Sequence, residues 1–290
     1  MGTSASSNGP GGGVPMVPSW VPPVPPPPDQ GSGPIDGNIQ NGPVPASSNP
    51  QPTALVQSTP VAPAGRFRGA RLNFGKYACS DGGKAGSRYL QRGLRNYVRK
   101  GYGGRANAVK RFGGTASTAE SLFGALSSIA AGQPAPGNLL DPTLLAGRSA
   151  REVMDAIVEA TRPIDGTQDA EASRCAIKDA LSELLTVFPE GNLDLRNLTE
   201  DQRTMAIELY VAFDVYKRVE LDIGKVIESK APTATVALSR LKEVKDYIRQ
   251  TVTAAFRKLR NAAQRVTTGR VNQVVLAALE ETFKVFEEYR

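Results

Sequence analysis

Apolar residues recur every three or four positions along most of the chain after Thr115, and this spacing predicts α-helices. Gly or Pro separates the periodic stretches, and alternating strand-like patterns are absent from them. The expected helices run from Thr115 to near Gly132, from Ser149 to Pro163, from about Ala170 to Phe188, from Thr199 to about Ser229, from about Thr233 to Val266, and onward from Gly269. Residues 115–290 are therefore expected to form an α-helical body.

Three of these helices begin with a Ser or Thr that is followed three residues later by Glu or Gln. In a capping box of this kind, the two side chains bond to the free backbone N–H groups of the first turn. The three candidate pairs are Ser117 with Glu120, Ser149 with Glu152, and Thr199 with Gln202.

The last two helices carry continuous apolar stripes on either side of a short break at Gly269. The stripe between Leu241 and Val266 advances by threes and fours, as in a coiled coil. Long helices joined by a short connection favour antiparallel packing. The expected fold class is all-α, a helical bundle with long antiparallel C-terminal helices.

Residues 1–64, the N-terminal tail, lack this periodicity and contain sixteen Pro and nine Gly. Such a segment has too little apolar surface to offset the entropy lost on ordering, so it is predicted to be disordered. It also holds the only Trp, Trp20, within the sequence VPMVPSWV. An exposed Trp favours a short anchor for a partner protein, and the alternative interpretation is a solubilising spacer.

The positive charge is concentrated in residues 65–114, the basic block. The block holds thirteen Lys or Arg and one acid, Asp81, so its net charge is +12. The tail contributes −2, and residues 115–290 contribute −3 from 22 bases and 25 acids, which together give the net charge of +7. The block is therefore the expected contact surface for an anionic partner.

Within the basic block, Arg66, Arg68 and Arg71 alternate with Gly and with Phe67 and Phe74. This pattern is reminiscent of Arg/Gly segments that wrap nucleic acid while aromatic rings stack on bases. Further along, Ser87 is a candidate cap for a helix from Arg88 to Lys100, followed by a short turn over residues 105–112.

The opposite side of that helix from its apolar stripe carries a row of arginines, namely Arg88, Arg92, Arg95 and Arg99. Seven of the nine arginines of the block are the candidate anion-binding residues, namely Arg66, Arg68, Arg71, Arg88, Arg92, Arg95 and Arg99. Two interpretations remain open for the row: it faces phosphates or an acidic protein, or it is a solvated face packed on an acidic body.

The chain contains no His and only two Cys, Cys79 and Cys175. This composition excludes Ser-His-Asp and Cys-His catalysis and His-bearing metal motifs, and it is too sparse for a disulfide framework. No apolar run is long enough to cross a bilayer, and no signal peptide is evident. We expect a cytoplasmic protein that is not an enzyme, with no catalytic residues, no metal, no cofactor and no membrane contact.

Three segments carry a family resemblance: the start MGTSASSNGPGGGVPMVPSWVP, the entry GRFRGARLNFGKYA, and the run GLRNYVRKGYGGRANAVKRFGGTA. Together they resemble QatB, the family of B components of the Qat (QatABCD) anti-phage defence system. The resemblance covers residues 1–25 and 65–125. It implies a bacterial protein encoded beside an ATPase, a QueC-like enzyme of 7-deazaguanine chemistry (the QatC type) and a TatD-like nuclease, and it implies no known activity for this component.

The resemblance gives the tail a specific hypothesis. Removal of Met1 would leave the amine of Gly2, with a pKa of about 8 against about 10.4 for lysine, so a sizeable fraction is nucleophilic near neutral pH. A QueC-like enzyme could accept this amine in place of ammonia, which would make Gly2 a modification site. The candidate partner-binding residues are Gly2, Thr3, Ser4, Pro15, Met16, Pro18 and Trp20. The alternative function is a nucleic-acid-binding module that acts through the basic block.

Overall fold

A computed structural model describes residues 65–133, 138–188 and 193–289. The predicted disorder of the N-terminal tail concerns residues that lie outside these ranges. The elements along the chain are α1 (Arg68–Cys79), α2 (Gly83–Asn96), the π-helix η1 (Tyr97–Gly101), α3 (Arg105–Arg111), α4 (Gly113–Ala130), α5 (Pro142–Leu145), α6 (Ala150–Thr161), α7 (Gln168–Val187), α8 (Glu200–Lys230), α9 (Ala234–Asn261) and α10 (Val271–Glu288).

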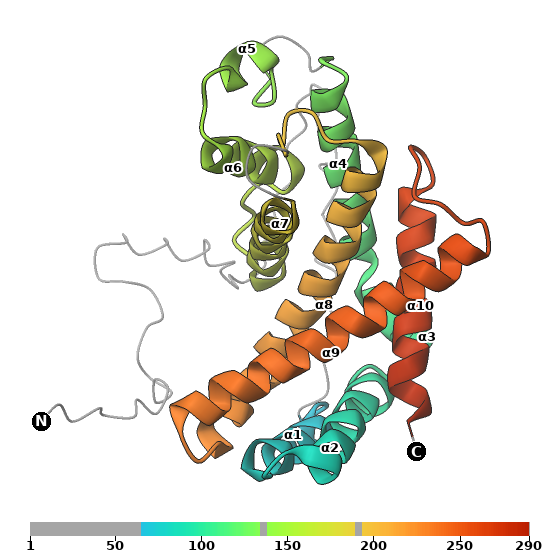
Figure 1. The fold of residues 1–290 in the computed structure, drawn as a ribbon. Coiled ribbons are helices and arrows are strands. Elements are labelled where there is room, and N and C mark those ends of the chain that lie inside the picture. The colour runs from blue at the N-terminus through green and yellow to red at the C-terminus, as the bar shows by residue number, and fades with distance from the viewer. Residues whose placement is uncertain (1–64, 134–137, 189–192, 290) are drawn as a thin grey trace, which may run out of the picture. The chain divides into compact units, whose positions relative to one another are not determined.

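The described residues are helical and contain no β-strand, which confirms the predicted all-α class (Figure 1). Helix α8 is the centre of the packing: it contacts α7, α9, α1 and α4, and most of its apolar residues are buried. Its two neighbouring apolar stripes explain this, because a helix that is apolar over a broad arc must be covered on several sides. None of the helices in the described ranges is long and apolar enough to cross a membrane.

The C-terminal helices α9 and α10 pack against each other, and the chain reverses direction between them, as the sequence predicts (Figure 1). Helix α9 ends at Asn261, five residues before the predicted end. Ala263 has a φ of 57°, and the N–H of Gln264 donates to the carbonyl of Leu259 at 2.9 Å, which closes the helix end. Val266 nevertheless stays buried in the connection.

Two of the three predicted capping boxes are confirmed. In α6, the Glu152 side chain accepts from the Ser149 N–H at 2.9 Å, and in α8 the Gln202 side chain accepts from the Thr199 N–H at 2.8 Å. The other predicted cap is wrong, because α4 begins at Gly113 and Ser117 lies inside the helix.

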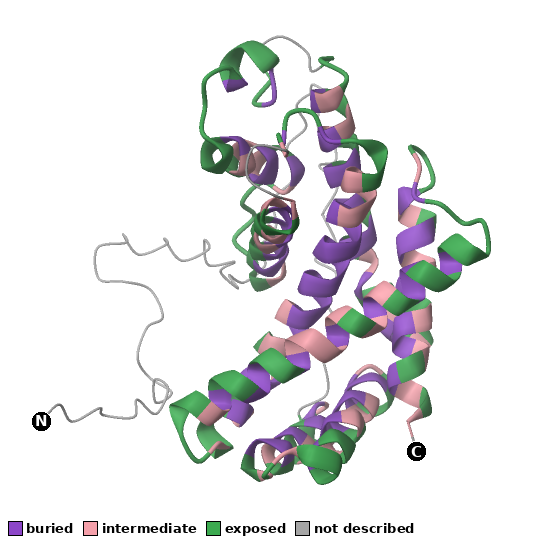
Figure 2. Cartoon of the chain, viewed as in Figure 1, coloured by how far each residue is buried: buried purple, intermediate pink, exposed green. Residues whose placement is uncertain are grey.

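The basic block contributes more helix than the sequence pattern predicts. Its first half forms α1, and α2 begins at Gly83, so Ser87 is an internal residue whose hydroxyl donates to the Gly83 carbonyl at 2.9 Å. In place of the predicted helix from Arg88 to Lys100, the structure has α2 followed by the π-helix η1. The predicted short turn over residues 105–112 corresponds to α3. Figure 2 shows that buried residues line the inner sides of α1 and α2.

Phe67 and Phe74 are both buried, 4% and 0% exposed, so the expectation that they stack on nucleic-acid bases is wrong. Each ring packs against a glycine. A Cβ on Gly93 would lie 2.9 Å from the ring of Phe74, and a Cβ on Gly101 would lie 2.4 Å from the ring of Phe67. These glycines allow close packing of the helices rather than a flexible wrapping segment.

Candidate functional site

The predicted modification and partner-binding residues of the tail lie outside the described residues. They are Gly2, Thr3, Ser4, Pro15, Met16, Pro18 and Trp20. The structure therefore bears on the second group of candidates, the seven candidate arginines of the basic block, all of which it describes.

Helix α2 is held to the body by one apolar side. Leu90 is 7% exposed, and Leu94 and Tyr97 are fully buried. The side chain of Asn96 donates to the carbonyl of Gly69 in α1 at 3.3 Å, which ties the two helices together. The opposite side of α2 therefore faces solvent, and Arg88, Arg92 and Arg99 are exposed there, as the spacing predicts, with Arg95 half-buried beside them.

Arg66 and Arg71 do not share the situation of the α2 arginines. The guanidinium of Arg66 lies 4.4 Å from the ring centre of Phe67 and 5.4 Å from that of Tyr102. The Nε of Arg71 donates to the backbone carbonyl of Asp222 in α8 at 3.1 Å. Arg71 therefore links α1 to α8 and Arg66 packs on two aromatic rings, although Arg71, like Arg68, is itself exposed.

The same corner holds a polar cluster built around Asp222. Its carboxylate accepts from the hydroxyl of Tyr97 at 2.9 Å, and the hydroxyls of Tyr97 and Tyr102 lie 3.2 Å apart. Burial raises the pKa of the Asp222 carboxyl, while the Tyr97 hydrogen bond and the charges of Arg66 and Arg71 oppose the rise. Burial also raises the pKa of Tyr97, so its hydroxyl stays protonated as a donor. The sequence spacing could not reveal this cluster.

The arginines of α2 lack acidic partners among the described residues. Of the thirteen cations of the basic block, two form ion pairs there: Arg105 with Glu280 at 3.7 Å and Arg111 with Asp169 at 2.7 Å. In the rest of the described chain, by contrast, many cations are paired, for example Lys178 with Asp155 at 2.7 Å. The structure therefore pairs none of the α2 arginines with an acid among the described residues.

A second polar cluster, centred on the fully buried Asp214, joins α4, α7 and α8. Asp214 is 0% exposed and accepts from the hydroxyl of Thr115 at 2.5 Å, from that of Ser173 at 2.6 Å and from the Nε of Arg218 at 2.9 Å. The guanidinium of Arg218 also pairs with Asp169 at 3.1 Å. Because every member has a partner inside the core, this cluster is a structural link between helices.

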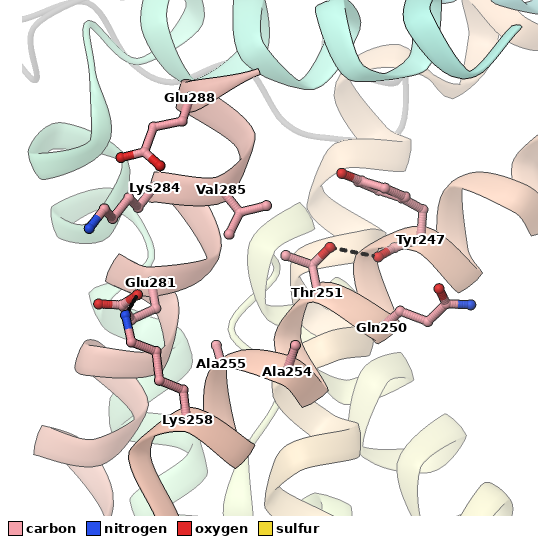
Figure 3. A pocket seen from close by; sticks show the side chains of 10 residues that line it. All are labelled: Tyr247, Gln250, Thr251, Ala254, Ala255, Lys258, Glu281, Lys284, Val285 and Glu288. Carbon is pink, nitrogen blue, oxygen red and sulfur yellow. Dashed lines mark hydrogen bonds and ion pairs between the residues drawn. The ribbon is translucent and has the colours of Figure 1, made fainter. Parts of the chain in front are cut away.

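An open groove of about 470 Å³ lies between α9 and α10 (Figure 3). Its floor is apolar, with Ala254, Ala255 and Val285, and the Lys258–Glu281 pair crosses its rim at 2.5 Å. The lysine lowers the pKa of Glu281 by hydrogen bonding. Over the described parts of the chain, no cluster of three or more His, Cys, Asp or Glu is placed to hold a metal ion.

Comparison with known families finds a match over the helical body. The model of QatB, described as "Qat anti-phage system associated protein QatB", matches residues 103–286. No curated protein and no solved structure matches the chain. The matched region begins near the end of the basic block and covers α3 to α10, so it rests on the helical body rather than on the tail.

Proposed function

The chain belongs to the QatB family of the Qat anti-phage system, and from this membership we propose that it is a non-catalytic component of the defence complex whose N-terminal tail binds a QueC-like enzyme. Membership makes other Qat components its partners. The finer proposal names the partner and the contact: residues 1–20 bind the QueC-like enzyme in the bacterial cytoplasm, and the Gly2 amine accepts a group from it. The observation that carries the proposal is the family match to the body, combined with a tail whose first twenty residues are mostly small and carry no charged side chain.

The chemistry of Gly2 suits an acyl acceptor. The QueC-type reaction joins a 7-deazaguanine carboxylate to ATP, releases pyrophosphate and leaves an acyl adenylate. The lone pair of the Gly2 nitrogen then attacks the acyl carbon, AMP leaves with the bonding electrons, and the amine loses a proton. The product is an amide, and the reaction needs no oxidant or reductant. A terminal amine with a pKa of about 8 is unprotonated far more often at neutral pH than a lysine.

The sequence around Gly2 suits entry into a narrow pocket. Thr3, Ser4 and the residues after them are small, and the glycines at 9 and 11–13 add little width. Pro15, Pro18 and Trp20 follow at a distance that leaves them outside such a pocket. There they supply apolar contact area, and the prolines reduce the entropy lost on binding.

Two deletions of equal length test the proposal. We expect the full chain, co-expressed with the QueC-like partner, to co-purify with it and to gain mass on its N-terminal peptide. Deletion of residues 2–20 should abolish both results, whereas deletion of residues 31–49, an equally long part of the tail, should preserve them. Trp20→Ala should weaken co-purification, and Trp20→Phe should retain most of it because an aromatic anchor remains.

The proposal is wrong if Gly2 is recovered with an unmodified amine and the complex forms equally well without residues 2–20. Loss of both results in the 31–49 deletion would also contradict it, because the tail would then act through its length.

A further inference from the structure

Five cations form one row along α2 and the adjoining turn η1. We name this row the α2 stripe, and its members are Lys84, Arg88, Arg92, Arg95 and Arg99. At about 100° per residue they fall within an arc of about 80°, and at about 1.5 Å per residue the row is about 22 Å long. The buried residues of α2 lie on the opposite side.

The α2 stripe carries charge that the described part of the protein leaves uncompensated. None of its five members takes part in an ion pair with a described residue, and the only acid in the basic block is Asp81. Neighbouring cations in a row repel one another. Binding of an anion is therefore favoured both by its attraction to the cations and by the reduced repulsion between them. The stripe is therefore poised for a partner with regularly repeated negative charge.

The stripe is also held in place by its packing. Leu94 and Tyr97 are fully buried beneath it, and the close contact between Gly93 and the ring of Phe74 fixes α2 on α1. A preformed row of charges loses less entropy on binding than a flexible Arg/Gly segment does. This geometry suits an extended, rigid partner.

The aromatic residues decide which kind of nucleic acid fits. Binding of single strands depends on exposed rings on which bases stack. Of the seven rings in the basic block, those of Phe67, Phe74, Tyr77, Tyr97 and Phe112 are at most 4% exposed, and those of Tyr89 and Tyr102 are partly exposed. The surface therefore offers cations to phosphates and few rings to bases, which favours a duplex in which the bases are already stacked.

We propose that the α2 stripe binds the phosphate backbone of double-stranded nucleic acid without reading its sequence. None of its five residues belongs to the segment 1–20, so the inference does not depend on the modification of Gly2. Cations that neutralise phosphates release counterions, which makes the affinity fall steeply with salt. The protein would in this way hold its partner enzymes close to a nucleic-acid target.

The test is fluorescence anisotropy of the full chain with a labelled duplex of mixed sequence, about 30 base pairs or roughly 100 Å long. Four to five neutralised phosphates predict a slope of about −4 for log affinity against log salt, and a loss of about 10²-fold between 50 and 200 mM. A duplex of unrelated sequence should bind equally well, and the corresponding single strand should bind more weakly. The chain lacking residues 2–20 should bind the duplex as the full chain does.

Matched variants assign the binding to the stripe. Arg88→Ala with Arg92→Ala should reduce the magnitude of the salt slope by about 2, because two phosphate contacts are lost. Charge reversal at the same two positions should remove binding at 50 mM salt. The control is Arg151→Glu with Arg270→Glu, which changes the net charge equally at exposed, unpaired residues of the described body. These control substitutions should leave most of the affinity intact.

Three results would overturn the inference: no duplex binding at about 50 mM salt, tighter binding of the single strand, or an equal loss in the control variant. If duplex binding is absent and the Arg88/Arg92 reversal instead removes an acidic Qat component from the purified complex, the stripe is a protein-binding face. Circular dichroism of each variant shows whether it folds, and we expect it to match the wild type because the altered side chains are exposed.

Discussion

Replacing Asp214 by Asn tests whether the buried polar cluster holds α4, α7 and α8 together. The carboxylate is fully buried and accepts hydrogen bonds from Thr115, Ser173 and Arg218, one on each of the three helices. The substitution keeps the shape of the side chain and removes its charge. It therefore leaves the guanidinium of Arg218, which is 8% exposed, without its nearest counter-charge.

The structure sets the size of the expected loss. Removing one partner of a buried ion pair costs about 3–5 kcal/mol. Two features place this case near the lower end: Arg218 keeps its pair with Asp169 at 3.1 Å, and the Asn carbonyl still accepts a hydrogen bond. We expect a loss of about 3 kcal/mol in the free energy of unfolding, which lowers Tm by roughly 6–12 °C in a body of this size.

Urea unfolding of the full chain, followed by circular dichroism, measures this loss. The control is Asp155→Asn, which breaks the surface ion pair between Asp155 and Lys178. The two side chains of this pair are 52% and 49% exposed. A surface pair of this kind contributes at most about 1 kcal/mol. Equal losses in the two variants would refute the reasoning.

A double substitution provides a second check. Asp214→Leu alone removes the nearest counter-charge of the buried Arg218, whereas Asp214→Leu with Arg218→Met removes both charges of the pair. Apolar replacement of a whole buried pair is often close to neutral. The double variant should therefore be more stable than Asp214→Leu alone, and strictly additive losses would show that the two charges are not coupled.

Three further predictions concern stability. Thr199→Ala should cost about 1 kcal/mol in urea unfolding because it removes a confirmed helix cap, while Ser117→Ala, inside α4, should cost nothing; equal costs would contradict the assignment of the caps. Gly101→Ala should cost about 1–3 kcal/mol because the new methyl meets the ring of Phe67, and an unchanged urea midpoint would show that the ring moves freely. Burial raises the pKa of Asp222, so the folded state binds the proton of this carboxyl more tightly than the unfolded state does. From pH 4 to 7 the free energy of unfolding of the wild type should therefore fall relative to that of Asp222→Asn. If it rises relative to the variant over this range, the assigned direction of the pKa shift is wrong.

The helices of the body could be predicted because their signals are local. The apolar stripes and the capping box of α8 are formed by residues three and four positions apart, and such residues are neighbours whenever the helix forms. The same locality explains the errors at Ser87 and Ser117: residues 83–86 and 113–116 before them are already helical, and Gly86, Thr115 and Ala116 are buried there by contacts that no local pattern contains. Helix α1 was missed because its Gly and Arg content weakens the periodic signal.

The same distinction between local and long-range signals applies to the candidate anion-binding arginines of the basic block. The row from Arg88 to Arg99 was visible as a helical spacing, and its exposure follows from the apolar side opposite to it. The role of Arg71 was not visible, since its hydrogen-bond partner, the backbone carbonyl of Asp222, lies about 150 residues away in sequence, beyond the reach of any local pattern. The burial of Phe67 and Phe74 was hidden for the same reason.

Local periodicity and composition thus dictated the helical class, the ends of α6 and α8, and the concentration of positive charge in one block. Tertiary contacts alone decided which cations of that block remain free and which rings are covered. The physical reason is that a helical pattern states which side of a helix must be buried, while the partner that buries it is chosen by packing between segments far apart in the chain.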